Sequence, residues 1–167
     1  MIDLSLSAEQ RNIVEGASTL LREHSPVARL RSGRTRDDIR RRLAGWGWFA
    51  VGLAENAGGL GLTIAEEALL YLEAGPFLLS PSVLATTLAA GLVDPALRAE
   101  LIAGNRSAAL AMTTGDGRAY CFDRDDAAVI VAIDGDETLV YPVEAFAGEL
   151  VAGLDETLAQ AKGRLDG

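Results

Sequence analysis

Residues that could do chemistry are few in this chain of 167 residues, and the most distinctive are three closely spaced glycines. Gly58, Gly59 and Gly61 fall within four positions, so the backbone there can take positive φ and approach a neighbour closely. The neighbour of such a loop can be a phosphate, a cofactor ring or simply the next helix. Because most Gly-Gly-x-Gly loops are ordinary turns, the glycines indicate a close contact but do not identify the partner.

Side chains that transfer protons, attack carbonyls or bind metals are sparse. His24 is the only histidine and Cys121 the only cysteine, which argues against a catalytic triad, a histidine metal site and a redox pair. Four carboxylates lie near predicted helix ends or loops, where capping or solvation explains them; they are Glu55, Glu66, Glu67 and Glu73. The catalytic residues are therefore unknown, and we expect no metal.

Charge divides the chain unevenly. Residues 1–105 hold ten basic and twelve acidic residues, whereas residues 106–167 hold five basic and twelve acidic residues. The arginines between positions 29 and 42 could meet an anion, but no aromatic residues are interleaved with them and the overall balance is acidic. A solvated helix face or a subunit contact is favoured, and we expect no nucleic-acid partner.

Neither a targeting segment nor a membrane span is predicted. The chain opens with an aspartate near its start, where a secretory segment would carry a basic residue. The longest apolar run, residues 83–93, is interrupted by polar residues and is far shorter than the ~20 residues that span a bilayer. We expect a cytoplasmic, disulfide-free protein without a membrane partner.

Start and stop signals predict five helices in the first 104 residues. Capping boxes open at Ser7 and Thr63, and a capping residue followed by proline opens two later helices at Ser80 and Asp94. The expected helices cover about residues 8–24, 36–46, 63–75, 81–93 and 95–104. Residues 83–93 are apolar nearly all round, so we expect this helix at the centre of the helical part.

After residue 105 the pattern changes to short apolar runs between glycine and aspartate clusters. Residues 108–112, 127–133 and 138–141 suit strands, and Asp134-Gly135 is a hairpin turn signal. From 143 to 164 the apolar residues recur at helical spacing, so periodicity alone predicts a helix. The sequence predicts a mainly α protein with a small β part, divided into domains at 1–105 and 106–167.

Several spaced motifs over about residues 3–105 resemble the N-terminal domain of the acyl-CoA dehydrogenases. They occur in the family's order and are the helix at Leu6-Ser-Ala-Glu-Gln10, the turn Gly45-Trp46-Gly-Trp-Phe, the loop Ala54-Glu55-x-x-Gly58-Gly59-x-Gly61, the helix end Glu73-Ala-Gly75 and the apolar helix with Pro81. The resemblance implies an orthogonal helical bundle followed by a short, reduced middle β-domain. It also implies FAD as cofactor, an acyl-CoA substrate and oxidation of its Cα–Cβ bond.

The resemblance also implies candidate site residues. Ala108-Ala-Leu-Ala-Met112-Thr113 looks like the first strand of the family's middle domain, so Met112 and Thr113 are the candidates for contact with the flavin. The candidates for the acyl pocket, each with core packing as the alternative, are Trp48, Phe77, Leu84 and Leu88.

The sequence departs from the family at several points. Thr114 stands where the family usually has glutamate, and the Trp-Ile-Thr strand that holds the flavin has no counterpart. This sequence also has no counterpart of the C-terminal helical domain, which carries the catalytic base in the family. By resemblance, residues 153–165 would be the family's last β segment, which conflicts with the helix that periodicity predicts.

Two functions follow as alternatives. The first is an acyl-CoA dehydrogenase-like flavoprotein, an oxidoreductase of fatty acid metabolism, with an electron-transfer flavoprotein as a candidate partner. The second is a non-catalytic helical subunit or assembly module that kept the helical domain and lost the flavin strand. In both cases we expect a homo- or hetero-oligomer that forms through an exposed apolar face of the helices.

Overall fold

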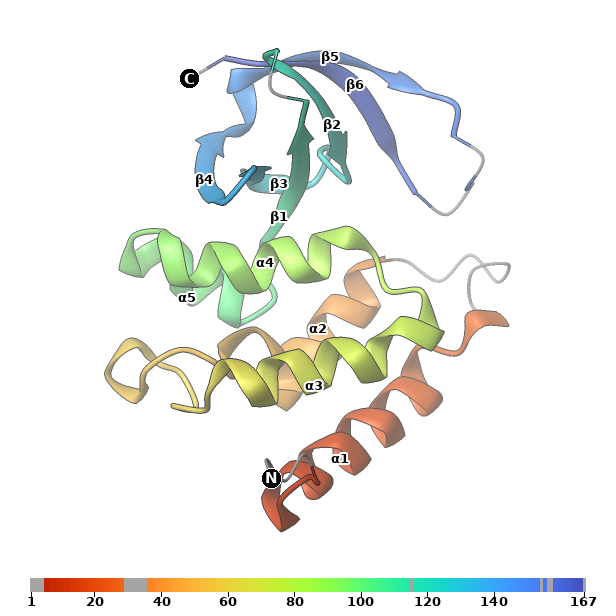
Figure 1. Cartoon of the computed structure of the whole chain (residues 1–167), viewed down its shortest axis with the longest axis vertical. Coiled ribbons are helices and arrows are strands. Elements are labelled where there is room, and N and C mark those ends of the chain that lie inside the picture. Colours follow the sequence, from red (N-terminus) through yellow and green to blue (C-terminus); the bar gives the residue numbers. More distant parts are fainter. Residues whose placement is uncertain (1–4, 29–35, 115, 154, 156–157, 167) are drawn as a thin grey trace.

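The computed structural model describes residues 5–28, 36–114, 116–153, 155 and 158–166. Helices come first along the chain and strands second (Figure 1). The described α-helices are α1 (Ala8–His24), α2 (Arg36–Trp46), α3 (Ile64–Ala74), α4 (Pro81–Leu92) and α5 (Pro95–Ile102). Short 3₁₀ helices are η2 (Trp48–Ala50), η3 (Glu55–Ala57), η4 (Gly75–Phe77) and η5 (Val143–Ala145). The strands are β1 (Ser107–Thr113), β2 (Arg118–Phe122), β3 (Ala127–Asp134), β4 (Glu137–Pro142), β5 (Phe146–Val151) and β6 (Gln160–Leu165).

The helices begin where the capping residues predict. At α1, the Ser7 hydroxyl accepts from the Gln10 backbone N–H at 3.1 Å, and the Gln10 side chain accepts from the Ser7 N–H at 3.0 Å. The same reciprocal arrangement joins Thr63 and Glu66 at the start of α3. Asp94 caps α5 by accepting from two backbone N–H groups. These bonds satisfy donors that have no partner inside the helix, which confirms the start signals.

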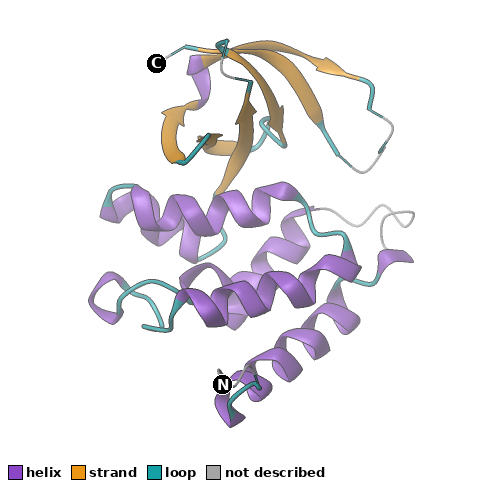
Figure 2. Cartoon of the chain, in the orientation of Figure 1, coloured by secondary structure: helices purple, strands orange, loops and turns teal. Residues whose placement is uncertain are grey.

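The strands form a six-stranded sheet in the order β4-β3-β1-β2-β6-β5. β1 and β3 are parallel, and the other neighbouring pairs are antiparallel. Figure 2 shows the sheet as a curved layer on one side of the helices. Its face away from the helices closes on a core of mostly small side chains, which are Ala109, Ala111, Ala119, Cys121, Ile130, Ala132, Phe146 and Ala161.

The helix that periodicity predicts over residues 143–164 is wrong, because β5 and β6 occupy half of this segment and the short η5 is the only helical turn among its described residues. Of the β segment that the family resemblance implies over residues 153–165, residues 160–165 form a strand, β6. Gly148 and Gly163 explain the difference, since they face each other in register across the two strands. A Cβ at Gly163 would lie 2.1 Å from the carbonyl oxygen of Ala147, so this close pairing requires glycine, which is a poor helix former.

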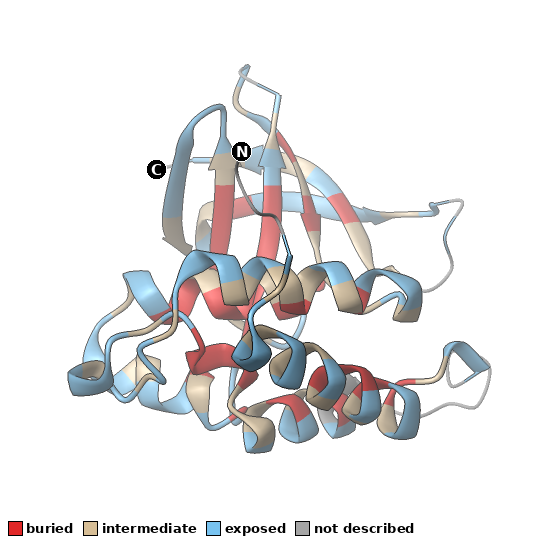
Figure 3. Cartoon of the chain, turned by 60° about the horizontal axis from the view of Figure 1, so that its bottom comes forward, coloured by how far each residue is buried: buried red, intermediate tan, exposed pale blue. Residues whose placement is uncertain are grey.

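Helix α4 lies between the other helices and the sheet, so it joins the two parts of the chain and is not at the centre of the helical part, where its all-round apolar character predicts it (Figure 1). The Thr86 hydroxyl donates to the Ser82 carbonyl at 2.6 Å and accepts from the backbone N–H of Ala108, the second residue of β1, at 3.0 Å. Ala85, Ala89 and Ala108 are fully buried, and such small side chains let the helix lie close to the strand. Figure 3 shows buried segments on the strands and helices where these layers meet.

We expect Thr86→Val to lower the free energy of unfolding by about 1–3 kcal/mol, because it leaves the buried N–H of Ala108 without its acceptor while keeping the side chain's shape. Chemical denaturation followed by circular dichroism measures the change. Thr19→Val is the matched control, since Thr19 also bonds a carbonyl one helical turn earlier but is exposed. Equal losses in the two variants would contradict a special role for the Thr86 bond.

Candidate functional site

Met112 and Thr113 lie at the open end of β1, where the strand extends beyond α4. Met112 projects on the side of the sheet that faces the helices, as Leu110 does, yet it is 52% exposed. Thr113 projects from the opposite face, and its hydroxyl donates to Asp134 Oδ1 at 2.7 Å. The two candidate flavin residues are therefore accessible, but they do not share a face.

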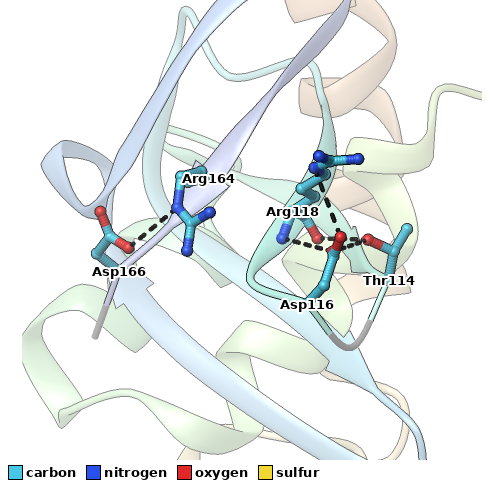
Figure 4. Close-up of polar contacts among 5 residues, drawn as sticks. All are labelled: Thr114, Asp116, Arg118, Arg164 and Asp166. Atoms are coloured by element: carbon cyan, nitrogen blue, oxygen red, sulfur yellow. Dashed lines mark hydrogen bonds and ion pairs between the residues drawn. The ribbon is translucent and has the colours of Figure 1, made fainter.

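A polar turn follows β1 and leads into β2 (Figure 4). The Thr114 hydroxyl donates to Asp116 Oδ1 at 2.6 Å, and the Arg118 backbone N–H donates to the same oxygen at 3.1 Å. The hydrogen bond from Thr114 is the largest cause that lowers the pKa of Asp116, followed by the bond from Arg118. Asp116 therefore remains ionised at neutral pH and holds the turn together through its two donors.

This end of the sheet meets some of the needs of a flavin ring. The exposed side chain of Met112 is an apolar surface for a flat ring, and Thr113 Oγ and the Asp134 carboxylate can accept from the ring N–H. A flavin also needs donors for its two carbonyl groups. The hydroxyls of Thr113 and Thr114 already donate to carboxylates, so those donors would come from outside this cluster.

The four candidates for the acyl pocket lie in different surroundings. Trp48 is fully buried and packs edge-on against Tyr71, with 6.0 Å between ring centroids. Phe77 packs against the same helical core, which places it with Trp48. Leu88 packs against the apolar cluster between α4 and the sheet, which contains Ala85, Ala89 and Leu110. Leu84 is partly buried on α4. A pocket role for these residues stays a prediction.

The glycine-rich loop folds against its own chain. Gly58 and Gly61 have φ of 85° and 68°, values that favour glycine. A Cβ at Gly59 would lie 2.0 Å from the Leu53 carbonyl oxygen, and the N–H groups of Gly59 and Gly61 donate to the carbonyls of Ala54 and Leu53. Of the partners that the sequence left open, the structure supports a turn that closes on the preceding residues.

Glu67 is the carboxylate that sequence reasoning undervalued. It lies on α3 one turn before Tyr71, and its carboxyl group packs directly over Gly52, where an added Cβ would come within 2.3 Å of Glu67 Oε2. Desolvation by burial raises its pKa. Its spacing of four residues from the inward-facing Tyr71 was the available signal.

Tyr71, one turn after Glu67 on α3, packs against the helical core. Its hydroxyl lies 2.6 Å from Thr87 Oγ1 on α4, and burial raises its pKa to about 12. The phenol is therefore neutral near pH 7 and serves to join α3 to α4. Glu66, in contrast, is a partly exposed capping residue whose pKa is lowered to about 2, mainly by the Thr63 hydroxyl.

Other kinds of site have little support. No group of three or more His, Cys, Asp or Glu side chains within the described ranges could hold a metal ion. Cys121 is fully buried, and burial raises the pKa of its thiol to about 11, so it is not a nucleophile at neutral pH. No helix in the described part of the chain is both long and apolar enough to cross a membrane.

Solved structures share this fold at low sequence identity. Glutaryl-coenzyme A dehydrogenase with glutaryl-CoA matches with a TM-score of 0.72 and 13% identity, over 99% of this chain and 55% of that chain. The ChsE4-ChsE5 complex from Mycobacterium tuberculosis matches with a TM-score of 0.68 and 15% identity, over 98% and 56%. The electron transferring flavoprotein of Acidaminococcus fermentans matches with a TM-score of 0.66 and 14% identity, over 99% and 57%.

The chain therefore has the fold of the acyl-CoA dehydrogenases, with helices followed by a sheet, and spans a little over half the length of these structures. Its sequence matches no protein-family model and no curated protein. The structures thus confirm the resemblance at the level of the fold.

We expect Glu67→Gln to stabilise the protein at pH 7. Because the pKa of Glu67 is raised in the folded state, the folded protein binds this proton more tightly than the unfolded chain does. The free energy of unfolding of the wild type therefore falls as the pH rises from the pKa of Glu67 in the unfolded chain to its higher pKa in the folded protein. Urea denaturation at pH 3 and pH 7 should show a difference between variant and wild type that grows with pH. Glu15→Gln, on the exposed side of α1, is the matched control; a Glu67 variant that behaves like it would contradict the desolvation argument.

Proposed function

We propose that this chain supplies the helical domain (residues 1–105) and a reduced middle β-domain (residues 106–167) of an acyl-CoA dehydrogenase-like flavoprotein. In this role it forms one wall of a site at which the Cα–Cβ bond of an acyl thioester is oxidised, and bound FAD would supply the hydride acceptor. The shared fold, which extends over 99% of the chain for glutaryl-coenzyme A dehydrogenase, is the observation that carries the proposal.

Within that site, Met112 would contact the face of the flavin ring. Thr113 and Asp134 lie on the opposite face of the sheet, so they would accept from the ring N–H only where the ring extends past the end of β1. The acyl chain would lie along the partly exposed side of α4. That side of the helix would form one wall of the acyl pocket, and buried side chains beneath it would set the shape of the wall. The residues assigned to this wall are Trp48, Phe77, Leu84 and Leu88. A carboxylate base from another segment or chain would remove the α proton.

We propose further that the chain works in a homo- or hetero-oligomer, with an electron-transfer flavoprotein as the electron acceptor. Two of the matching structures are described as the ChsE4-ChsE5 complex and as an electron transferring flavoprotein, which supports both kinds of partner. Helix α3 offers a surface for subunit contact, because Ile64 and Leu72 are 78% and 74% exposed on one side of it.

One observation favours a second candidate, a non-catalytic helical subunit or assembly module of the same fold. The hydroxyls of Thr113 and Thr114 donate to Asp134 and Asp116, so the hydroxyls nearest the proposed flavin position are not available to its carbonyl groups. Two carboxylates at this position would also oppose the negative charge that a flavin gains on reduction.

Absorption spectra of the purified chain, recorded before and after FAD is added and again after gel filtration, test the proposal. We expect flavin bands that elute with the protein, and we expect Met112→Lys to remove them because it places a charged ammonium group against the apolar ring. Leu150→Lys is the matched control, since Leu150 is also an exposed strand residue but lies on the edge strand β5.

A colourless chain that retains no added FAD, although folded by circular dichroism, would overturn the flavin role of Met112 and Thr113 and leave the second candidate. Flavin retained equally by wild type and the Met112 variant would place the cofactor elsewhere on the chain.

A further inference from the structure

Helix α3 reverses the distribution of residue types that is usual on a surface helix. Such a helix normally turns its apolar side chains to the core and its charged side chains to solvent. On α3 the four exposed residues are all apolar, whereas the three glutamates are all partly buried. The exposed residues are Ile64, Ala65, Ala68 and Leu72. The solvent-facing side of α3, all of whose residues are described, therefore carries no charged side chain.

Two of the glutamates on α3 contact other parts of their own chain. Glu66 accepts from the Gln10 side chain of α1 at 2.8 Å, and Glu67 packs over Gly52. A contact centred on the exposed side of α3 therefore brings no exposed glutamate of this helix against its partner. This matters for a pair of identical chains, because each carries a net charge of −9 and like charges in a contact oppose it.

The exposed apolar residues of α3 are arranged symmetrically about Ala68. Ile64 lies four residues before Ala68 and Leu72 four residues after it, so the three form a row along one side of the helix. The two large side chains lie about 6 Å along the helix axis on either side of the small one. Ile64 and Leu72 are also the two most exposed large apolar residues in the described part of the chain. The row is large, small, large in either direction.

A row with this symmetry is complementary to itself. When two copies of α3 pack in opposite directions around a two-fold axis at Ala68, each Ile64 meets the Leu72 of the other copy. The i, i+4 rows of two helices run alongside each other at a crossing angle of about −50°, and a small residue at the crossing point lets the axes approach closely. One patch on each copy completes the contact, so no second surface is required.

We propose that two copies of this chain form a two-fold symmetric dimer through α3, with Ile64 of each copy against Leu72 of the other and Ala68 at the axis. This inference rests on the subunit contact proposed above for α3 and names the partner as a second copy. A contact of one short helix from each copy is smaller than the roughly 1,200–2,000 Å² of stable interfaces. We therefore expect a reversible dimer whose population rises with protein concentration.

Sedimentation velocity of the full chain, over about a hundredfold range of concentration, tests the proposal. We expect a shift from monomer to dimer as the concentration rises. Ile64→Glu and Leu72→Lys should each weaken dimerisation at least about tenfold, because each places two charges in an apolar contact. Leu92→Glu is the matched control, since Leu92 is an exposed leucine at the end of a different helix, α4, and should leave the dimer unchanged.

A double variant that carries both Ile64→Glu and Leu72→Lys tests the antiparallel arrangement. In that arrangement each introduced carboxylate lies opposite an introduced ammonium group of the other copy, so the double variant should dimerise more tightly than either single variant. In a parallel pair, like charges would meet at both positions, and the double variant would dimerise most weakly. The two positions are too far apart along one helix for the introduced groups to pair within a chain.

A chain that stays monomeric at every concentration, or a dimer that Leu92→Glu weakens as much as the α3 variants do, would overturn the proposal. A double variant weaker than both single variants would overturn the antiparallel arrangement. Circular dichroism of each variant shows that it is folded. Retention of FAD is a separate measurement: a monomeric chain that retains FAD would leave the flavoprotein role standing, and a colourless dimer would leave the α3 contact standing.

Discussion

The contact between α4 and β1 is the constraint on which the rest of the structure depends. A parallel strand buried on both faces must leave few polar groups unsatisfied, and here Thr86 of the helix accepts the N–H of Ala108 where the strand begins. At the N-terminus of α4, Ser80 caps the helix and also donates to the buried carboxylate of Asp123, in the loop after β2. These two polar contacts tie helix and sheet together, and alanines fill the space between them.

This contact also decides where function can lie. Because α4 covers only the first part of β1, the helix-facing side of the sheet is closed at Ala108 and Leu110 but open at Met112. The open region continues to Arg118 of β2 and Lys162 of β6, which are exposed, whereas Phe122 at the other end of β2 packs against the helices. Because β1 pairs with β2 in this register, Met112 lies beside Tyr120 on the same face of the sheet.

The sequence indicated the helices well because their signals are local. Ser7, Thr63 and Asp94 each bond to backbone groups two or three residues away, so a short window of sequence contains the whole interaction. The segment after residue 143 was harder, since its apolar spacing fits a helix and the pairing of Gly148 with Gly163 is visible only once the two strands lie together. The family resemblance supplied that long-range information.

The site was less predictable than the fold for the same physical reason. Met112 and Thr113 could be selected from a motif, but the bond from Thr113 to Asp134 joins strands 21 residues apart, and the opposition of Arg118 and Arg164 depends on the register of β2 with β6. A fold shared at 13–15% identity does not by itself determine which side chains occupy such positions. The chemistry at the open end of this sheet therefore depends on the side chains found there, where Asp134 and Asp116 accept from the threonines and Arg118 lies opposite Arg164 on the neighbouring strand.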